Sequence, residues 1–132
     1  EDLKIWGMWN ILGEEVFGDA SQEEIRPWYY TWSLICRYFP SGSSILKVVS
    51  DECCGFTAAA AVKDGKMSVA LVNCNEEQLN VNLNLPRALE NAVMFSFNRP
   101  GKVSESVAPS NGCLKMSVPA ESLILLTEME ND

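Results

Sequence analysis

The sequence predicts a mainly β protein, an antiparallel β-sandwich of about seven or eight strands that follows an N-terminal strand–loop–helix segment. One observation behind this prediction is a change near Pro40, where apolar residues stop recurring at helical spacing and begin to alternate. Another is the distribution of aromatic residues, because nine of the twelve lie in the first 39 positions. We therefore expect two parts, a strand–loop–helix unit over residues 1–40 and a β-sandwich domain over residues 41–132.

The N-terminal unit begins with an apolar segment, residues 3–9 (Leu-Lys-Ile-Trp-Gly-Met-Trp), which is predicted to be a strand buried on both faces. Residues 10–20 are expected to form a loop. Ser21 and Glu24 have the spacing of a capping box at a helix start. Pro27 suits the first residue of the main helix, where a missing N–H costs nothing.

The main helix is predicted to end before Pro40 and to carry an aromatic stripe. The residues at helical spacing along this stripe are Trp28, Trp32, Ile35 and Phe39. Aromatic side chains bury about 150–250 Å² each. We therefore expect the stripe to pack, and a larger body than residues 41–132 alone is needed to cover the whole N-terminal unit.

The sandwich half is predicted from alternating apolar residues separated by turn signals. Asp64-Gly65 is the strongest hairpin signal, and Asn111-Gly112 marks a second turn. The interior is expected to consist of Val, Leu, Ile and Ala, with Phe95 and Phe97 also pointing inward. The predicted strands cover residues 45–50, 56–63, 66–73, 79–85, 93–97, 103–107, 114–118 and 123–127.

The net charge of −8 is spread evenly, with −4 in the first forty residues and −4 in the remainder. Because no basic stripe is present, nucleic acid and anionic membranes are not expected as partners. A neutral ligand such as a sugar is compatible with this balance. No apolar run reaches the length of a membrane span, and the chain shows no signal-peptide pattern.

The chain has five cysteines and no histidine. The odd number of cysteines and the lack of Cys-x-x-Cys spacing favour buried or half-buried free thiols, with one disulfide or a metal as the alternative. Free thiols favour a reducing compartment such as the cytoplasm. We expect no metal and no cofactor. Without histidine, a Ser-His-Asp or Cys-His nucleophile cannot be assembled within this chain.

Paired carboxylates would still allow glycosidase chemistry, which needs two acids facing each other across about 5–9.5 Å. The acids occur as adjacent pairs at predicted turns and helix starts. Even on a strand, adjacent residues would point to opposite faces, so no pair by itself supplies two facing carboxylates. We expect these pairs to be solvated and assign no catalytic residue. The pairs are Glu14-Glu15, Glu23-Glu24, Asp51-Glu52 and Glu76-Glu77.

Trp6 and Trp9 on the predicted first strand are candidate sugar contacts, because an indole can stack on the apolar face of a pyranose in a concave site. Being three residues apart on a strand, they point to opposite faces. One of them is then free to face a ligand while the other packs inside. From local sequence alone, structural packing is the favoured interpretation of each.

Three segments together suggest a family. The helix R-P-W-Y-Y-T-W-S-L-I-C-R-Y-F-P (26–40) follows an apolar strand ending in Trp9 and precedes S-G-S-S-I-L-K-V (41–48). The segments D-G-K-M-S-V-A-L-V-N-C-N (64–75) and L-K-M-S-V-P-A-E-S-L-I-L-L-T (114–127) follow. In this order they resemble the last β/α unit of a retaining (β/α)8-barrel glycoside hydrolase running into its C-terminal β-sandwich.

The resemblance implies that the catalytic carboxylates sit at the ends of the fourth and seventh barrel strands, which this chain does not contain. The chain alone is therefore expected to be inactive. One position carries over: such barrels often have an indole at the end of the eighth strand, flooring a sugar subsite. Trp9 matches this position, and Trp6 matches it less well, because active sites lie at the C-terminal strand ends.

The main hypothesis is therefore a non-catalytic accessory domain of a glycoside hydrolase, with the catalytic barrel as its partner and carbohydrate reached through the parent enzyme. A stand-alone carbohydrate-binding module is an alternative. It requires exposed aromatics on the sandwich, where Phe56 is the one candidate outside the Phe95 and Phe97 pair. Another alternative is a structural domain whose aromatic helix forms an oligomer interface.

Overall fold

The computed structural model describes residues 14, 18–22, 25–51, 53–98, 102–108 and 111–130. The predicted strand 3–9, with Trp6 and Trp9, lies outside the described residues, as does Glu24 of the predicted capping box. The helices are η2 (Ala20–Gln22) and α2 (Pro27–Tyr38). The strands are β1 (Ser44–Leu46), β2 (Phe56–Lys63), β3 (Lys66–Asn73), β4 (Leu79–Asn84), β5 (Val93–Asn98), β6 (Lys102–Val107), β7 (Cys113–Val118) and β8 (Ser122–Thr127).

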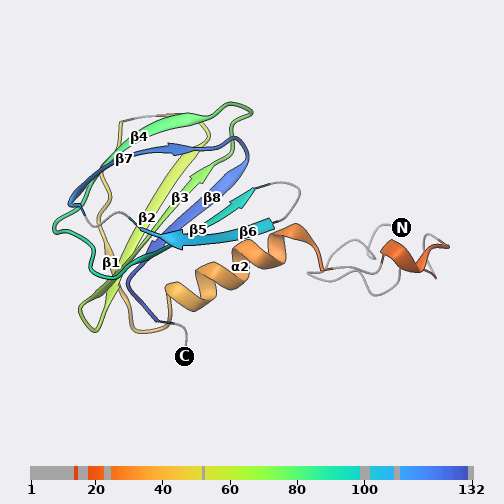
Figure 1. The fold of residues 1–132 in the computed structure, drawn as a ribbon, viewed down its shortest axis with the longest axis horizontal. Coiled ribbons are helices and arrows are strands. Elements are labelled where there is room, and N and C mark those ends of the chain that lie inside the picture. The colour runs from red at the N-terminus through yellow and green to blue at the C-terminus, as the bar shows by residue number, and fades with distance from the viewer. Residues whose placement is uncertain are drawn as a thin grey trace.

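The strands form two antiparallel sheets that face each other across an apolar core. The larger sheet has six strands in the order β1-β2-β3-β8-β5-β6, and the smaller pairs β4 with β7. Figure 1 shows the smaller sheet on one side of the larger one and α2 on the other. The predicted fold class, an antiparallel β-sandwich of seven or eight strands after a helical segment, is confirmed for the described residues. None of the described helices is long and apolar enough to cross a membrane.

The β2–β3 hairpin forms as the sequence predicts. Asp64 and Gly65 both have positive φ, 52° and 79°, as a two-residue turn matching the twist of the flanking strands requires. The ladder then runs without a break from Lys63 opposite Lys66 to Phe56 opposite Asn73. Both strand boundaries match the prediction.

Strands β3 and β8 lie at the centre of the larger sheet and are covered on both faces. Every residue of β8 is buried. Ile124 and Leu126 belong to the core between the sheets, whereas Leu123 and Leu125 belong to a second cluster under α2. Burial on both faces explains why β8 is a continuous apolar run, Leu-Ile-Leu-Leu, rather than an alternating one.

Two predictions about strands need correction. The first strand was expected over residues 45–50, but β1 ends at Leu46, the last residue that pairs with β2. Phe95 and Phe97 are buried as expected, yet they lie under α2 on the outer face of the sheet. Side-chain alternation fixes only that the two rings share a face, and the helix decides which face is covered.

The prediction of buried or half-buried thiols is wrong. All five cysteines are free, as expected, but all five are exposed. Cys36 lies on the solvent side of α2, and Cys113 occupies an outward position on β7. Cys53 and Cys54 precede β2 and Cys74 follows β3, so these three lie in turns and their side chains are in water.

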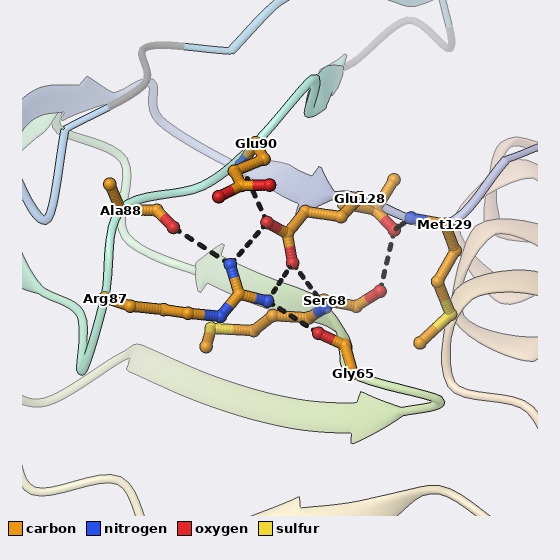
Figure 2. A network of polar contacts seen from close by, with 9 residues as sticks. Gly65, Ser68, Arg87, Ala88, Glu90, Glu128 and Met129 are labelled. Atoms are coloured by element: carbon orange, nitrogen blue, oxygen red, sulfur yellow. Dashed lines mark hydrogen bonds and ion pairs between the residues drawn. The ribbon is translucent and has the colours of Figure 1, made fainter.

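The ion pair between Arg87 and Glu128 links three segments at the end of the sandwich near α2 (Figure 2). The carboxylate of Glu128, after β8, accepts hydrogen bonds from Arg87 Nη1 at 2.6 Å and Arg87 Nη2 at 2.5 Å. It also accepts the backbone N–H groups of Met67 and Glu90, each at 2.7 Å. Arg87 Nη2 in turn donates to Gly65 C=O at 2.7 Å. The β2–β3 turn, the β4–β5 loop and the segment after β8 thus meet at one carboxylate.

Burial of Glu128 opposes its ionisation, and its side chain is only 4% exposed. The hydrogen bonds from Arg87, Glu90 and Met67 outweigh this effect and lower the pKa of Glu128 to about 2. Since the folded-state pKa lies below the ordinary value of 4.5, this group stabilises the fold at neutral pH. Its contribution is lost as the pH falls from about 4.5 toward 2.

We predict that Glu128→Gln lowers the free energy of unfolding by about 2 kcal/mol at pH 7, because Arg87 keeps a partner of similar shape but loses its counter-charge. The variant should also lose much of the decline in stability between pH 4.5 and pH 2. Urea titrations at pH 7 and pH 3 measure both effects. Glu130→Gln is the matched control, because Glu130 pairs with Lys66 in an exposed bridge, and such bridges contribute little to stability. Equal losses in the two variants would contradict the assignment.

Candidate interaction site

The local sequence sets both ends of helix α2, with Pro27 at its start and Pro40 just after its end. Pro27 is its first residue, and the preceding Arg26 is extended, so the fixed φ of proline suits this start. Arg37 lies in the last turn, where a positive charge interacts favourably with the helix dipole. Phe39 N–H still bonds Ile35 C=O at 2.9 Å, and Pro40 cannot continue the ladder.

One face of α2 packs on the outer surface of the larger sheet. Tyr38 is 1% exposed, and its ring stacks on Phe95 with centroids 5.2 Å apart. Two turns earlier, Tyr30 stacks on Phe97 at 6.3 Å. Leu34 lies between them in the helix and is also buried. Helical spacing on α2 and alternation on β5 therefore place two aromatic pairs in register.

The opposite face of α2 is apolar and exposed. Trp28 is 45% exposed and Trp32 is 55% exposed. Tyr29 and Ile25 are exposed as well. The spacing 28, 29 and 32 places the three aromatic residues on one side of the helix, and Ile25 lies just before its first turn. We call Ile25, Trp28, Tyr29 and Trp32 the aromatic face.

The aromatic face continues into a hollow of about 490 Å³ between α2 and the sheet. Trp32 and Ile35 line it from the helix, while Val72, Phe97 and Leu123 line it from β3, β5 and β8. Contiguous apolar surface of this kind on a soluble protein usually marks an interaction site. The described chain therefore presents a candidate docking surface on its helix.

The stripe predicted from the sequence coincides only in part with the face of α2 that packs on the sheet. Ile35 and Phe39 are partly buried against the helix–sheet cluster, but Trp28 and Trp32 remain 45% and 55% exposed. The signal that was missed is the second helical series, Tyr30, Leu34 and Tyr38. Both series have the spacing of a helix, and only the position of Phe95 and Phe97 selects which one meets the sheet.

Four described carboxylates, those of Glu90, Glu105, Glu128 and Glu130, line one hollow. Glu128 is the most perturbed, yet its oxygens are occupied by four donors, and a pKa of about 2 prevents it from acting as a general acid near neutral pH. Among residues with described positions, no three His, Cys, Asp or Glu side chains are grouped to hold a metal ion.

The other predicted contact residues are placed as follows. Phe56 is half-buried and packs against the core between the sheets, so it does not form an open aromatic platform. Trp6 and Trp9 lie outside the described residues, and a sugar contact at either stays a prediction.

Comparison with known proteins finds likeness only at the level of structure. No family model matches the sequence, and no curated protein matches it. Similar solved structures include a family 30 glycoside hydrolase, an endoxylanase from Clostridium papyrosolvens C71, with a TM-score of 0.68 and 14% identity. Another is the family 30 subfamily 8 xylanase from Clostridium acetobutylicum, with a TM-score of 0.68 and 15% identity.

These alignments cover most of this chain but only a minor part of each hydrolase. They span 81% and 83% of this chain, but 28% and 29% of the two hydrolases. The matched part of this chain therefore spans less than a third of each hydrolase. The likeness shows that the fold occurs as part of larger glycoside hydrolases.

We predict that Tyr38→Ala destabilises the protein by about 3–5 kcal/mol, because it removes a buried ring together with its stacking on Phe95. Trp32→Ala should cost less than about 1 kcal/mol, since its indole is largely in water. Urea unfolding of both variants measures the difference. A larger loss for Trp32→Ala would mean that the helix rests on the sheet by its other face.

Proposed function

We propose that this chain is a non-catalytic accessory β-sandwich domain of a glycoside hydrolase, and that the aromatic face of α2 docks on the catalytic domain. The observation that carries the proposal is the exposure of Trp28 and Trp32 on a helix whose opposite face is already packed. In this role the domain supports the catalytic barrel and shapes its substrate cleft. Trp9 is the residue we propose to contact sugar in the intact protein.

The size of the surface supports a domain interface. Each aromatic side chain buries about 150–250 Å² when covered, and the aromatic face has three partly exposed rings. With the adjoining hollow, the apolar area reaches several hundred Å², at the upper limit for an isolated monomer. Interfaces between domains of one chain bury about 600–1,500 Å² in total, which a patch of this size can supply.

The fraction of each hydrolase that this chain matches supports the same proposal. The chain corresponds to 28–29% of two xylan-cleaving hydrolases, and the remainder of such a protein is long enough to hold a catalytic body. In a barrel glycoside hydrolase of the kind this sequence resembles, the catalytic carboxylates lie at the ends of barrel strands. We infer that the parent protein carries its catalytic residues outside this chain.

The aromatic face also supports a second candidate, an interface with another copy of this chain. A stand-alone carbohydrate-binding module has less support, because Phe56 is half-buried and the sandwich has no tryptophan or tyrosine. Affinity electrophoresis on plant polysaccharides tests the module. Retardation that Phe56→Ala abolishes would favour it.

We predict that the chain does not hydrolyse nitrophenyl glycosides, because the chemistry requires two facing carboxylates and the resemblance assigns them to barrel strands outside this chain. The assay should cover xylosides, glucosides and arabinosides, with a complete glycosidase as positive control. Turnover that disappears when one acid of this chain is neutralised would overturn the accessory role.

We predict that the isolated chain self-associates through its aromatic face, and that Trp28→Ser with Trp32→Ser restores a monomer. Sizing chromatography over a range of concentrations measures this. Arg37→Ser is the matched control on the same helix, because it changes an exposed residue outside the aromatic face. A wild-type chain that is monomeric at every concentration and binds no apolar dye would count against a docking surface.

Sequence upstream of Glu1 separates the two candidates. A glycoside hydrolase parent predicts roughly 250 further residues of alternating strands and helices before it. An unrelated domain there would contradict the proposed role and favour the homo-oligomer.

A further inference from the structure

Asn111 and Gly112 lie just before β7, and the fold does not explain why residue 112 is a glycine. In a tight hairpin turn, an Asn-Gly pair is selected because positive φ is needed. Gly65 of the β2–β3 turn has such a φ, but Gly112 does not. A Cβ added at Gly112 would meet its nearest neighbour, Ala88 N, at 3.6 Å, which is ordinary van der Waals contact. Neither backbone conformation nor space therefore requires this glycine.

Gly112 is held through its carbonyl group. Its C=O accepts the N–H of Leu85 at 2.7 Å, one residue beyond the pairing of Asn84 with Cys113 in the β4–β7 ladder. Neither the N–H of Gly112 nor the side chain of Asn111 is hydrogen-bonded to another residue that the structure describes. The side chain of Asn111 is also exposed. The two groups that could react with each other are therefore both accessible.

A backbone nitrogen that follows an asparagine can attack the carboxamide of that asparagine. Here the nitrogen of Gly112 forms a bond to Cγ of Asn111, and the bond from Cγ to Nδ2 breaks. Nδ2 leaves as ammonia and takes the proton that the Gly112 nitrogen loses. Water then opens the cyclic imide at either of its carbonyls, which leaves aspartate or isoaspartate at position 111. Glycine favours the ring closure because it has no Cβ to obstruct the attack.

We propose that Asn111 is a modification site of this protein, at which the folded chain deamidates spontaneously and faster than at any other described asparagine. The co-reactant is water, and the products are ammonia and a carboxylate. The inference is independent of the proposed function, because every reacting atom belongs to two adjacent residues of this chain.

Other asparagines lack the features that make Asn111 reactive. Asn111 is the one asparagine in the sequence that glycine follows. Asn73 is 1% exposed, and its Nδ2 donates to Pro119 C=O at 2.9 Å. The Nδ2 of Asn75 donates to Cys54 C=O at 3.0 Å. The asparagines of β4 are exposed, but they lie in a paired strand and each precedes valine or leucine, whose side chain crowds the attacking nitrogen.

The fold tolerates modification at position 111. The β4–β7 ladder begins at Cys113 on the β7 side, so an extra main-chain methylene in isoaspartate falls in the preceding turn and not in the paired strand. Each event replaces a neutral carboxamide with a carboxylate and makes the net charge of −8 more negative by one. A more acidic, folded form of the chain should therefore accumulate with time.

The test is incubation of the folded chain in mildly alkaline buffer, which promotes loss of the amide proton, followed by tryptic peptide mapping with mass spectrometry. Cleavage after Lys102 and Lys115 gives a peptide in which Asn111 is the sole asparagine. This peptide should convert to its aspartate and isoaspartate forms about tenfold or more faster than any other described asparagine. Faster conversion at another described asparagine, or conversion at 111 only after unfolding in urea, would overturn the proposal.

Gly112→Ala separates the reaction from the fold, because a Cβ is accommodated at this position. The variant should unfold at nearly the same urea concentration as the wild type, but it should deamidate at least about tenfold more slowly. Asn111→Gln is the matched control, since it keeps a carboxamide and moves it one bond farther from the attacking nitrogen, and its peptide should stay unmodified. Equal rates of deamidation in the wild type and Gly112→Ala would contradict attack by the Gly112 nitrogen.

Discussion

The pairing of β8 with β3 and β5 is the constraint on which the rest of the structure depends. Because β8 is buried on both faces, its odd and even residues must each be covered by a different element. Ile124 and Leu126 are covered by the smaller sheet, and Leu123 and Leu125 are covered by α2. The three layers of helix, large sheet and small sheet follow from this one strand.

Polar networks fix the two ends of this layered core. At one end Glu128 joins Arg87 and the backbone of two other segments. At the other end the buried Asn73 donates to the carbonyls of Glu77 at 2.8 Å and Pro119 at 2.9 Å. Among the described residues each buried polar side chain is hydrogen-bonded, so the networks specify how the loops meet without the cost of an unpaired group. Apolar layers alone would permit the sheets to slide.

The surface proposed as functional, the aromatic face, is one that this arrangement leaves uncovered. The helix uses Tyr30, Leu34 and Tyr38 to cover the sheet, which turns Trp28 and Trp32 outward. The smaller sheet uses β7 to cover the centre of the larger one, which leaves the edge of β4 beside a groove. The aromatic face is apolar, whereas the groove beside β4 is lined by both polar and apolar residues.

The sequence by itself determined the strands, the β2–β3 turn and the start of α2, because alternation, Asp64-Gly65 and Pro27 act through local backbone geometry. It also determined that Phe95 and Phe97 share a face. Only the tertiary structure decided which helical series meets those rings, because the series of Trp32 and that of Tyr38 have the same spacing. Likewise, Asn111-Gly112 predicted a turn, but only the pairing of β4 with β7 decided that this glycine adopts no left-handed conformation, because its carbonyl continues the ladder.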